Sequence, residues 1–237
     1  MRNQFVSKVR GRVGQALAMT EHVPGRVERQ EFHHELGAIE AKVIELFTMV
    51  ADDVPRAGDA LLNGNSEVAR ALAERDRVID ALYPQIEELA DREILLQQPL
   101  ASDFRLLISV LRVVPELERS HDLIVDIARR GNLILSQDLS ARSRVLIEHM
   151  GSLAAEMWRE AVDCWCERDR SAAVALGGRD EEMVELYASL MAELASGGMT
   201  LPVTMELTLV ARFYERLADH AFNIARRVIY LAGHAPG

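Results

Sequence analysis

Side chains with oxygen donors recur every four residues in two segments of the chain. The two series are Glu118, Asp122 and Asp126, and Glu215, Asp219 and Asn223. Residues four apart lie on one face of an α-helix, so each series should form a stripe of oxygen atoms along its helix. Neighbouring acids on such a stripe repel each other by about a few tenths of a kcal/mol. A hard cation would remove this repulsion, and each stripe is therefore a candidate metal site.

One helix supplies too few oxygens to hold a cation, so a second helix must contribute. Asp76 and Asp80 are also four residues apart, and they could face Glu118 and Asp122 across a helix interface. Carboxylate and amide oxygens without a thiolate favour magnesium, manganese, calcium or iron over copper, with zinc as second choice.

An internal repeat relates the two stripes. Residues 116–130 read ELERSHDLIVDIARR, and residues 213–227 read FYERLADHAFNIARR, at a constant offset of 97. The acids at the first two stripe positions are identical in the two copies, although many of their neighbours differ. A match in register over a segment of this length indicates duplication of a structural unit.

The paired acids upstream repeat less completely. Residues 75–83 read RDRVIDALY and residues 179–187 read RDEEMVELY, at an offset of 104. Asp180 therefore repeats Asp76, but the second acid is replaced by Val184. We expect the second site to bind a cation more weakly than the first, because it has lost a ligand.

Two other interpretations of the stripes stay open. Charge on a solvated helix face is common, and such a face need bind no metal. A metalloenzyme or metal-storage bundle would use Glu-x-x-His pairs on two helices. Glu118 and His121 make that pair once, whereas Glu215 is followed at the same spacing by Ala218. The sequence lacks a P-loop, a nucleophile elbow, a zinc-protease motif and a dinucleotide fingerprint, so we predict no catalytic residue and a protein that is not an enzyme.

Hydrophobic periodicity of three and four residues predicts an all-α fold of long antiparallel helices. The predicted helices span 30–53, 66–96, 100–130, 140–170, 179–195 and 201–231. Pro55 and Gly58 should end the first helix, and Ser66 should cap the second. Pro84 and Pro115 fall inside predicted helices, where each should kink or split its helix.

The repeat divides these helices into two three-helix units, residues 30–133 and 134–237. Residues 1–29 form an N-terminal extension, which we expect to be either disordered or a basic amphipathic helix. On the last helix the acidic stripe lies roughly opposite the apolar seam, and His121 and His220 sit beside the two stripes.

Composition narrows the class of protein. The formal net charge of -10 argues against nucleic-acid binding, which needs a basic surface. The i, i+2 spacing of Cys164 and Cys166 prevents a local disulfide on a helix and predicts free thiols. The sequence has no apolar stretch of about 20 residues and no signal-peptide pattern, so we expect a cytoplasmic protein.

The repeated acidic segments resemble the PhoU family, in an actinobacterial-like form. Residues 97–122 read QQPLASDFRLLISVLRVVPELERSHD, and residues 211–233 read ARFYERLADHAFNIARRVIYLAG. These are similar to the glutamine-proline turn with the first acidic motif, and to the C-terminal part of that family. The resemblance covers about residues 30–233.

The resemblance implies two three-helix bundles that repress phosphate uptake and phosphate-starvation signalling. It implies an adaptor, expected as a homodimer, between a phosphate ABC transporter and a sensor histidine kinase, reaching the membrane only through these partners. It also implies metal clusters on the acidic motifs. The implied ligands are Asp76, Asp80, Glu118, Asp122 and Asp126 for one cluster, and Asp180, Glu215, Asp219 and Asn223 for the other.

Overall fold

The computed structural model describes residues 24–97, 99, 101–131 and 139–233. Within these residues the chain forms six α-helices and no strand. The helices are α2 (Pro24–Asn63), α3 (Ser66–Gln97), α4 (Ala101–Arg130), α5 (Ala141–Glu167), α6 (Arg170–Ala195) and α7 (Leu201–Ala232). The prediction of an all-α fold with long helices is confirmed.

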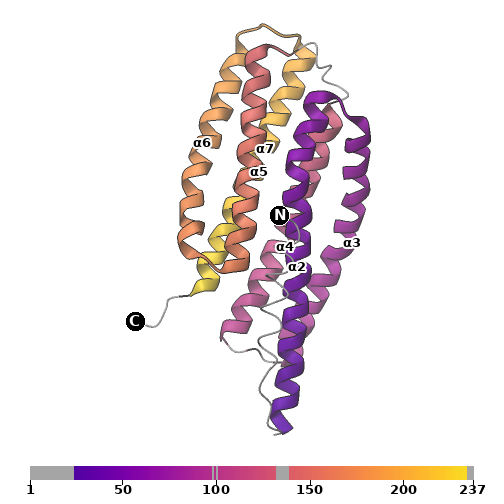
Figure 1. Cartoon of the computed structure of the whole chain (residues 1–237), viewed down its shortest axis with the longest axis vertical. Coiled ribbons are helices and arrows are strands. Elements are labelled where there is room, and N and C mark those ends of the chain that lie inside the picture. Colours follow the sequence, from indigo (N-terminus) through magenta and orange to yellow (C-terminus); the bar gives the residue numbers. More distant parts are fainter. Residues whose placement is uncertain (1–23, 98, 100, 132–138, 234–237) are drawn as a thin grey trace.

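The helices form two groups of three that lie side by side (Figure 1). Helices α2, α3 and α4 pack against one another, and so do α5, α6 and α7. Between the groups, α4 packs on α7 and α2 packs on α5. Buried apolar side chains of all six helices form one continuous core. The halves therefore share a hydrophobic interior.

Large aromatic side chains fill the contact between the two groups. Phe47 of α2 lies against Trp158 and Trp165 of α5, with ring centroids 6.5 and 5.6 Å away. The indole nitrogen of Trp158 donates a hydrogen bond to the carbonyl oxygen of Leu217 at 3.0 Å. Truncation of a buried aromatic side chain typically costs about 3–5 kcal/mol, so these residues are major contributors to stability.

The first helix is longer than predicted. Pro55 and Gly58 do not end α2, which continues to Asn63. Pro55 is exposed, while Val54 and Ala57 beside it are buried. Burial of these neighbours holds the backbone helical and offsets the one hydrogen bond that proline removes.

The other two prolines do not split their helices. Helix α3 continues through Pro84, and α4 continues through Pro115. The predicted cap of α3 is wrong by one residue. The side chain of Asn65, not Ser66, accepts a hydrogen bond from the backbone N–H of Val68 at 3.2 Å.

Helix α6 begins earlier than predicted, at Arg170 rather than 179. The carboxylate of Asp169 caps it by accepting hydrogen bonds from the backbone N–H groups of Ser171 (2.8 Å) and Ala172 (3.1 Å). The cap outweighs the low helix propensity of Gly177 and Gly178, which lie inside the helix.

The first helix begins within the predicted N-terminal extension. Helix α2 begins at Pro24, so residues 24–29 of the predicted extension are helical, while residues 1–23 lie outside the described residues. Cys164 and Cys166 are free thiols, as predicted. Among the described residues no helix combines the length and apolar character needed to cross a membrane.

Candidate functional site

Helices α3 and α4 bring together the acids of the first half. We call Asp76, Asp80, Glu118, Asp122 and Asp126 the first acidic ridge. Burial raises the pKa of Glu118, and repulsion from Asp122 and Asp80 raises it further, although Arg119 opposes this shift. Burial also raises the pKa of Asp122, and the negative charges of Asp76, Asp80 and Asp126 raise it further. These shared interactions place the carboxylates of the two helices close to one another.

The second acidic ridge, Asp180, Glu215 and Asp219, lies on α6 and α7. Burial and then the charge of Asp219 raise the pKa of Asp180. Burial also raises the pKa of Glu215, against the opposing charge of Arg212, which pairs with it. Val184 is 53% exposed, so the position that lacks an acid faces solvent.

Asn223, the fourth predicted ligand of the second half, lies four residues after Asp219 on α7 and is exposed. It also lines a cavity whose other polar side chains are four arginines and Glu116.

The carboxylate oxygens of the ridges are ligands that a hard cation prefers, but their side chains are not arranged around a common point. In the described part of the chain, no group of three or more His, Cys, Asp or Glu side chains is arranged to hold a metal ion. Asp76 is hydrogen-bonded to His121, and Asp126 lies 3.6 Å from Arg130. A cation would therefore require ridge side chains to turn toward a common point.

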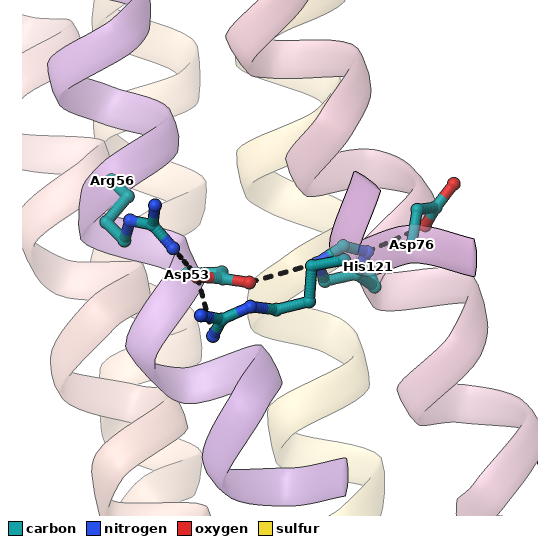
Figure 2. A network of polar contacts seen from close by, with 5 residues as sticks. Asp53, Arg56, Asp76 and His121 are labelled. Carbon is teal, nitrogen blue, oxygen red and sulfur yellow. Dashed lines mark hydrogen bonds and ion pairs between the residues drawn. The ribbon is translucent and has the colours of Figure 1, made fainter. Parts of the chain in front are cut away.

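Behind the first acidic ridge lies a buried polar network that the sequence did not indicate (Figure 2). Nδ1 of His121 lies 2.7 Å from Oδ1 of Asp76, and Nε2 lies 3.1 Å from Oδ2 of Asp53. Asp53 also pairs with Arg56 at 2.7 Å and with Arg75 at 3.2 Å. His121 was expected beside the acidic stripe, but it is fully buried and connects α4 to both α2 and α3.

The repeat replaces two members of this network with apolar residues in the second half. At the two repeat offsets, Asp53 corresponds to Met157 and His121 corresponds to Ala218, and both replacements are buried. The sequence feature that could have indicated the buried network is Asp53, an acid between Val50 and Val54 on the apolar face of its helix.

A second histidine lies where the two halves meet. His220 of α7 makes a 2.8 Å hydrogen bond through Nδ1 with the hydroxyl group of Ser120 on α4. Its Nε2 lies 3.4 Å from Oε2 of Glu116. Burial lowers the pKa of His220, while the charge of Glu116 opposes the shift.

The family assignment comes from comparison with known proteins. Residues 43–131 and 147–228 each match the PhoU domain. A phosphate-specific transport system accessory protein PhoU homolog from Pseudomonas aeruginosa is 31% identical over 218 residues, covering 90% of this chain and 88% of that protein. The homolog from Aquifex aeolicus is 33% identical over 202 residues, covering 84% of this chain and 91% of its own.

Solved structures agree with the sequence matches. The crystal structure of PhoU from Pseudomonas aeruginosa superposes with a TM-score of 0.80 at 31% identity, covering 86% of this chain and 100% of that one. The phosphate transport system regulatory protein PhoU from Streptococcus pneumoniae gives a TM-score of 0.78 at 25% identity, covering 86% and 98%. The chain, matched in both of its halves, belongs to the PhoU domain family.

Proposed function

We propose that this protein is the regulatory accessory component of a phosphate-specific transport system, and that it restrains phosphate uptake when phosphate is ample. The match of both three-helix halves to the PhoU domain carries the proposal. The names of relatives that align along most of this chain support it. The proposed role is cytoplasmic and needs no catalytic step.

The protein would act as an adaptor, in contact with the phosphate transporter and with a sensor histidine kinase, and as a homodimer. Its long helices share one continuous core, which favours a rigid body that presents fixed surfaces to its partners. Phosphate status would then be reported through protein contacts rather than through a chemical product.

We further propose that the acidic ridges bind cations, magnesium, manganese, calcium or iron first and zinc second. In the first ridge burial raises the pKa values of Glu118 and Asp122, and repulsion between the carboxylates of α3 and α4 raises them further. A cation would supply the positive charge that offsets this repulsion and would hold the two helices together at the ridge. Thermal unfolding with and without a chelator should then show that bound metal stabilises the protein. Glu118→Ala should remove this stabilisation, and Glu45→Ala, on an exposed part of α2, should retain it.

Deletion of the gene tests the regulatory proposal. In a strain with no other PhoU-family protein, deletion should give unrestrained phosphate uptake and constant expression of a phosphate-starvation reporter. The wild-type gene on a plasmid should restore both controls. Normal repression in the deletion strain would overturn the proposal. Turnover of phosphoesters or oxygen by purified protein, lost in Glu118→Ala, would instead support the metalloenzyme alternative.

A further inference from the structure

A cavity of about 620 Å³ opens between α4 and α7, which pack against each other where the two halves meet. Its polar lining consists of Arg112, Glu116 and Arg119 of α4, and of Asn223, Arg226 and Arg227 of α7. Its volume lies in the range of small-molecule and cofactor sites, roughly 300–1,000 Å³. Four of its lining residues are arginines, in a chain whose formal net charge is -10.

Three of these arginines are not neutralised by the protein. Arg112, Arg226 and Arg227 make no ion pair with any carboxylate in the described part of the chain. Burial lowers the pKa of Arg227, and the nearby charges of Arg112 and Arg226 lower it further. Like charges held together in this way leave a strong local positive potential, which attracts anions.

The one acid in the cavity is already paired. Oε1 of Glu116 lies 3.1 Å from Nη2 of Arg119, and its Oε2 lies 3.4 Å from Nε2 of His220. Glu116 therefore offsets the charge of Arg119 and leaves the other three guanidinium groups without a carboxylate partner. The ion pair uses only Nη2 of Arg119, whose remaining N–H groups can still contact an anion. Arg112 and Arg226 are exposed, so an anion can reach them from solvent.

The repeat provides an internal comparison for the arginine pair on α7. Arg226 and Arg227 repeat Arg129 and Arg130 of α4. Arg130 is neutralised, since its Nε lies 3.1 Å from Oε2 of Glu206, and it stacks on the ring of Phe213. Arg130 thus makes structural contacts in the first half, whereas its equivalent Arg227 lines an open cavity in the second.

The spacing of the arginines indicates the size of the anion. Arg112 and Arg119 are seven residues apart on α4, which is a rise of about 10.5 Å along the helix. A chain of two or three phosphates matches the length of such a row better than a single phosphate group does. Guanidinium groups also match phosphate oxygens through paired hydrogen bonds.

We propose that the cavity between α4 and α7 binds a di- or triphosphate group, either as an inorganic anion or as part of a nucleotide. The site lies apart from the acidic ridges and uses no metal. The inference goes beyond the regulatory role, and it can be tested on purified protein whatever the outcome in cells.

Calorimetric titration of the full chain, freed of metal and then of chelator, tests the proposal. The probes are pyrophosphate, inorganic triphosphate, ATP, orthophosphate and sulfate, each at low and at high salt. Triphosphate and pyrophosphate should bind at least about tenfold more tightly than orthophosphate and sulfate, and salt should weaken binding. Tighter binding of ATP than of triphosphate would identify a nucleotide as the source, and equal binding would identify the phosphate chain alone.

Variants locate the site. Arg226→Gln and Arg112→Gln should each weaken triphosphate binding by about tenfold or more, as expected for loss of one charge-assisted contact. Both residues are exposed, so the fold should be retained, which thermal unfolding checks. The matched control is Arg129→Gln, the repeat equivalent of Arg226, which should bind like wild type. Equal effects of Arg129→Gln and Arg226→Gln, or orthophosphate binding as tight as triphosphate binding, would overturn the proposal.

Discussion

His121 and Asp53 form a contact of 3.1 Å between α4 and α2, and neither side chain has any exposed surface. The other ring nitrogen of His121 contacts Asp76, which is 21% exposed. Each ring nitrogen of His121 therefore has a carboxylate partner, one on α2 and one on α3. One side chain thus links the apolar interior to the first acidic ridge.

Removal of His121 should destabilise the protein strongly. His121→Ala leaves Asp53 buried without one of its partners, and breaking a buried charged pair costs about 3–5 kcal/mol. We expect the lower end of that range, because Arg56 and Arg75 still contact Asp53. Urea unfolding measured by circular dichroism gives the free energy of unfolding.

The second half supplies the control for this prediction. The double variant Asp53→Met, His121→Ala copies Met157 and Ala218, which occupy the equivalent buried positions. It should be more stable than His121→Ala alone by about 1–2 kcal/mol, because no buried charge is left unpaired. If the double variant is the less stable of the two, the loss of stability in His121→Ala does not come from leaving Asp53 without His121.

Two glycines should respond in opposite ways to alanine. A Cβ atom at Gly131 would lie 2.2 Å from the carbonyl oxygen of Ala60 and 2.9 Å from Cα of Leu61. Since both are backbone atoms, Gly131→Ala must shift the end of α2 or of α4, at a cost of about 1–3 kcal/mol. A Cβ at Gly178, inside α6, meets nothing within 4 Å. Gly178→Ala should therefore stabilise the protein by about 0.5–1 kcal/mol.

Differential scanning calorimetry on both alanine variants measures these effects. The melting temperature should fall for Gly131→Ala and rise for Gly178→Ala. A neutral result at Gly131 would mean that the contact between the turn after α4 and the end of α2 is looser than described.

Local sequence signals predicted the features that depend on local structure. The apolar periodicity of the last helix predicted residues 201–231, close to the observed bounds of Leu201–Ala232. The signals failed at Pro55, which breaks helices in isolation but here lies between buried neighbours. The ridges were predicted from the sequence because the repeat retains three acids, Asp76, Glu118 and Asp122, as Asp180, Glu215 and Asp219. The contact of His121 with Asp53 was missed because it joins residues 68 positions apart, and only the packing of α2 on α4 brings them together.

The two thiols should react slowly with alkylating reagents. Burial raises the pKa of Cys164 to about 11, with Asp169 and Glu160 adding to the shift. Burial likewise raises the pKa of Cys166 to about 11. Because the thiolate is the reactive species, two pKa units lower the reactive fraction near pH 8 about a hundredfold relative to an ordinary thiol.

Peptide mass spectrometry after iodoacetamide treatment measures this reactivity between pH 7 and pH 10. The labelling rate of folded protein should still be rising steeply at pH 10, whereas that of protein unfolded in urea should be half-maximal near pH 9 and level off toward pH 10. A half-maximal rate near pH 9 in the folded protein would show that the thiols are less shielded than their surroundings indicate.

The two acidic ridges should differ in cation affinity, and Val184 is the residue that makes the difference. The first ridge has Asp80 at the position where the second has Val184. We therefore expect tighter Mn²⁺ binding by the first ridge. Val184→Asp restores a carboxylate four residues after Asp180, on the same face of α6, and should raise the affinity of the second ridge by about tenfold or more.

Equilibrium dialysis with Mn²⁺ followed by elemental analysis measures the metal held per chain. The control is Val174→Asp, the same change at an exposed valine of the same helix, ten residues away and on a different face. It adds the same charge without completing a pair with Asp180, so it should leave the tight binding unchanged. Equal gains from both variants would trace the effect to net charge alone. Equal occupancy of the two ridges in the wild-type protein would show that the acid at this position is not needed, because cations would then be held by Asp180, Glu215 and Asp219 without a fourth carboxylate.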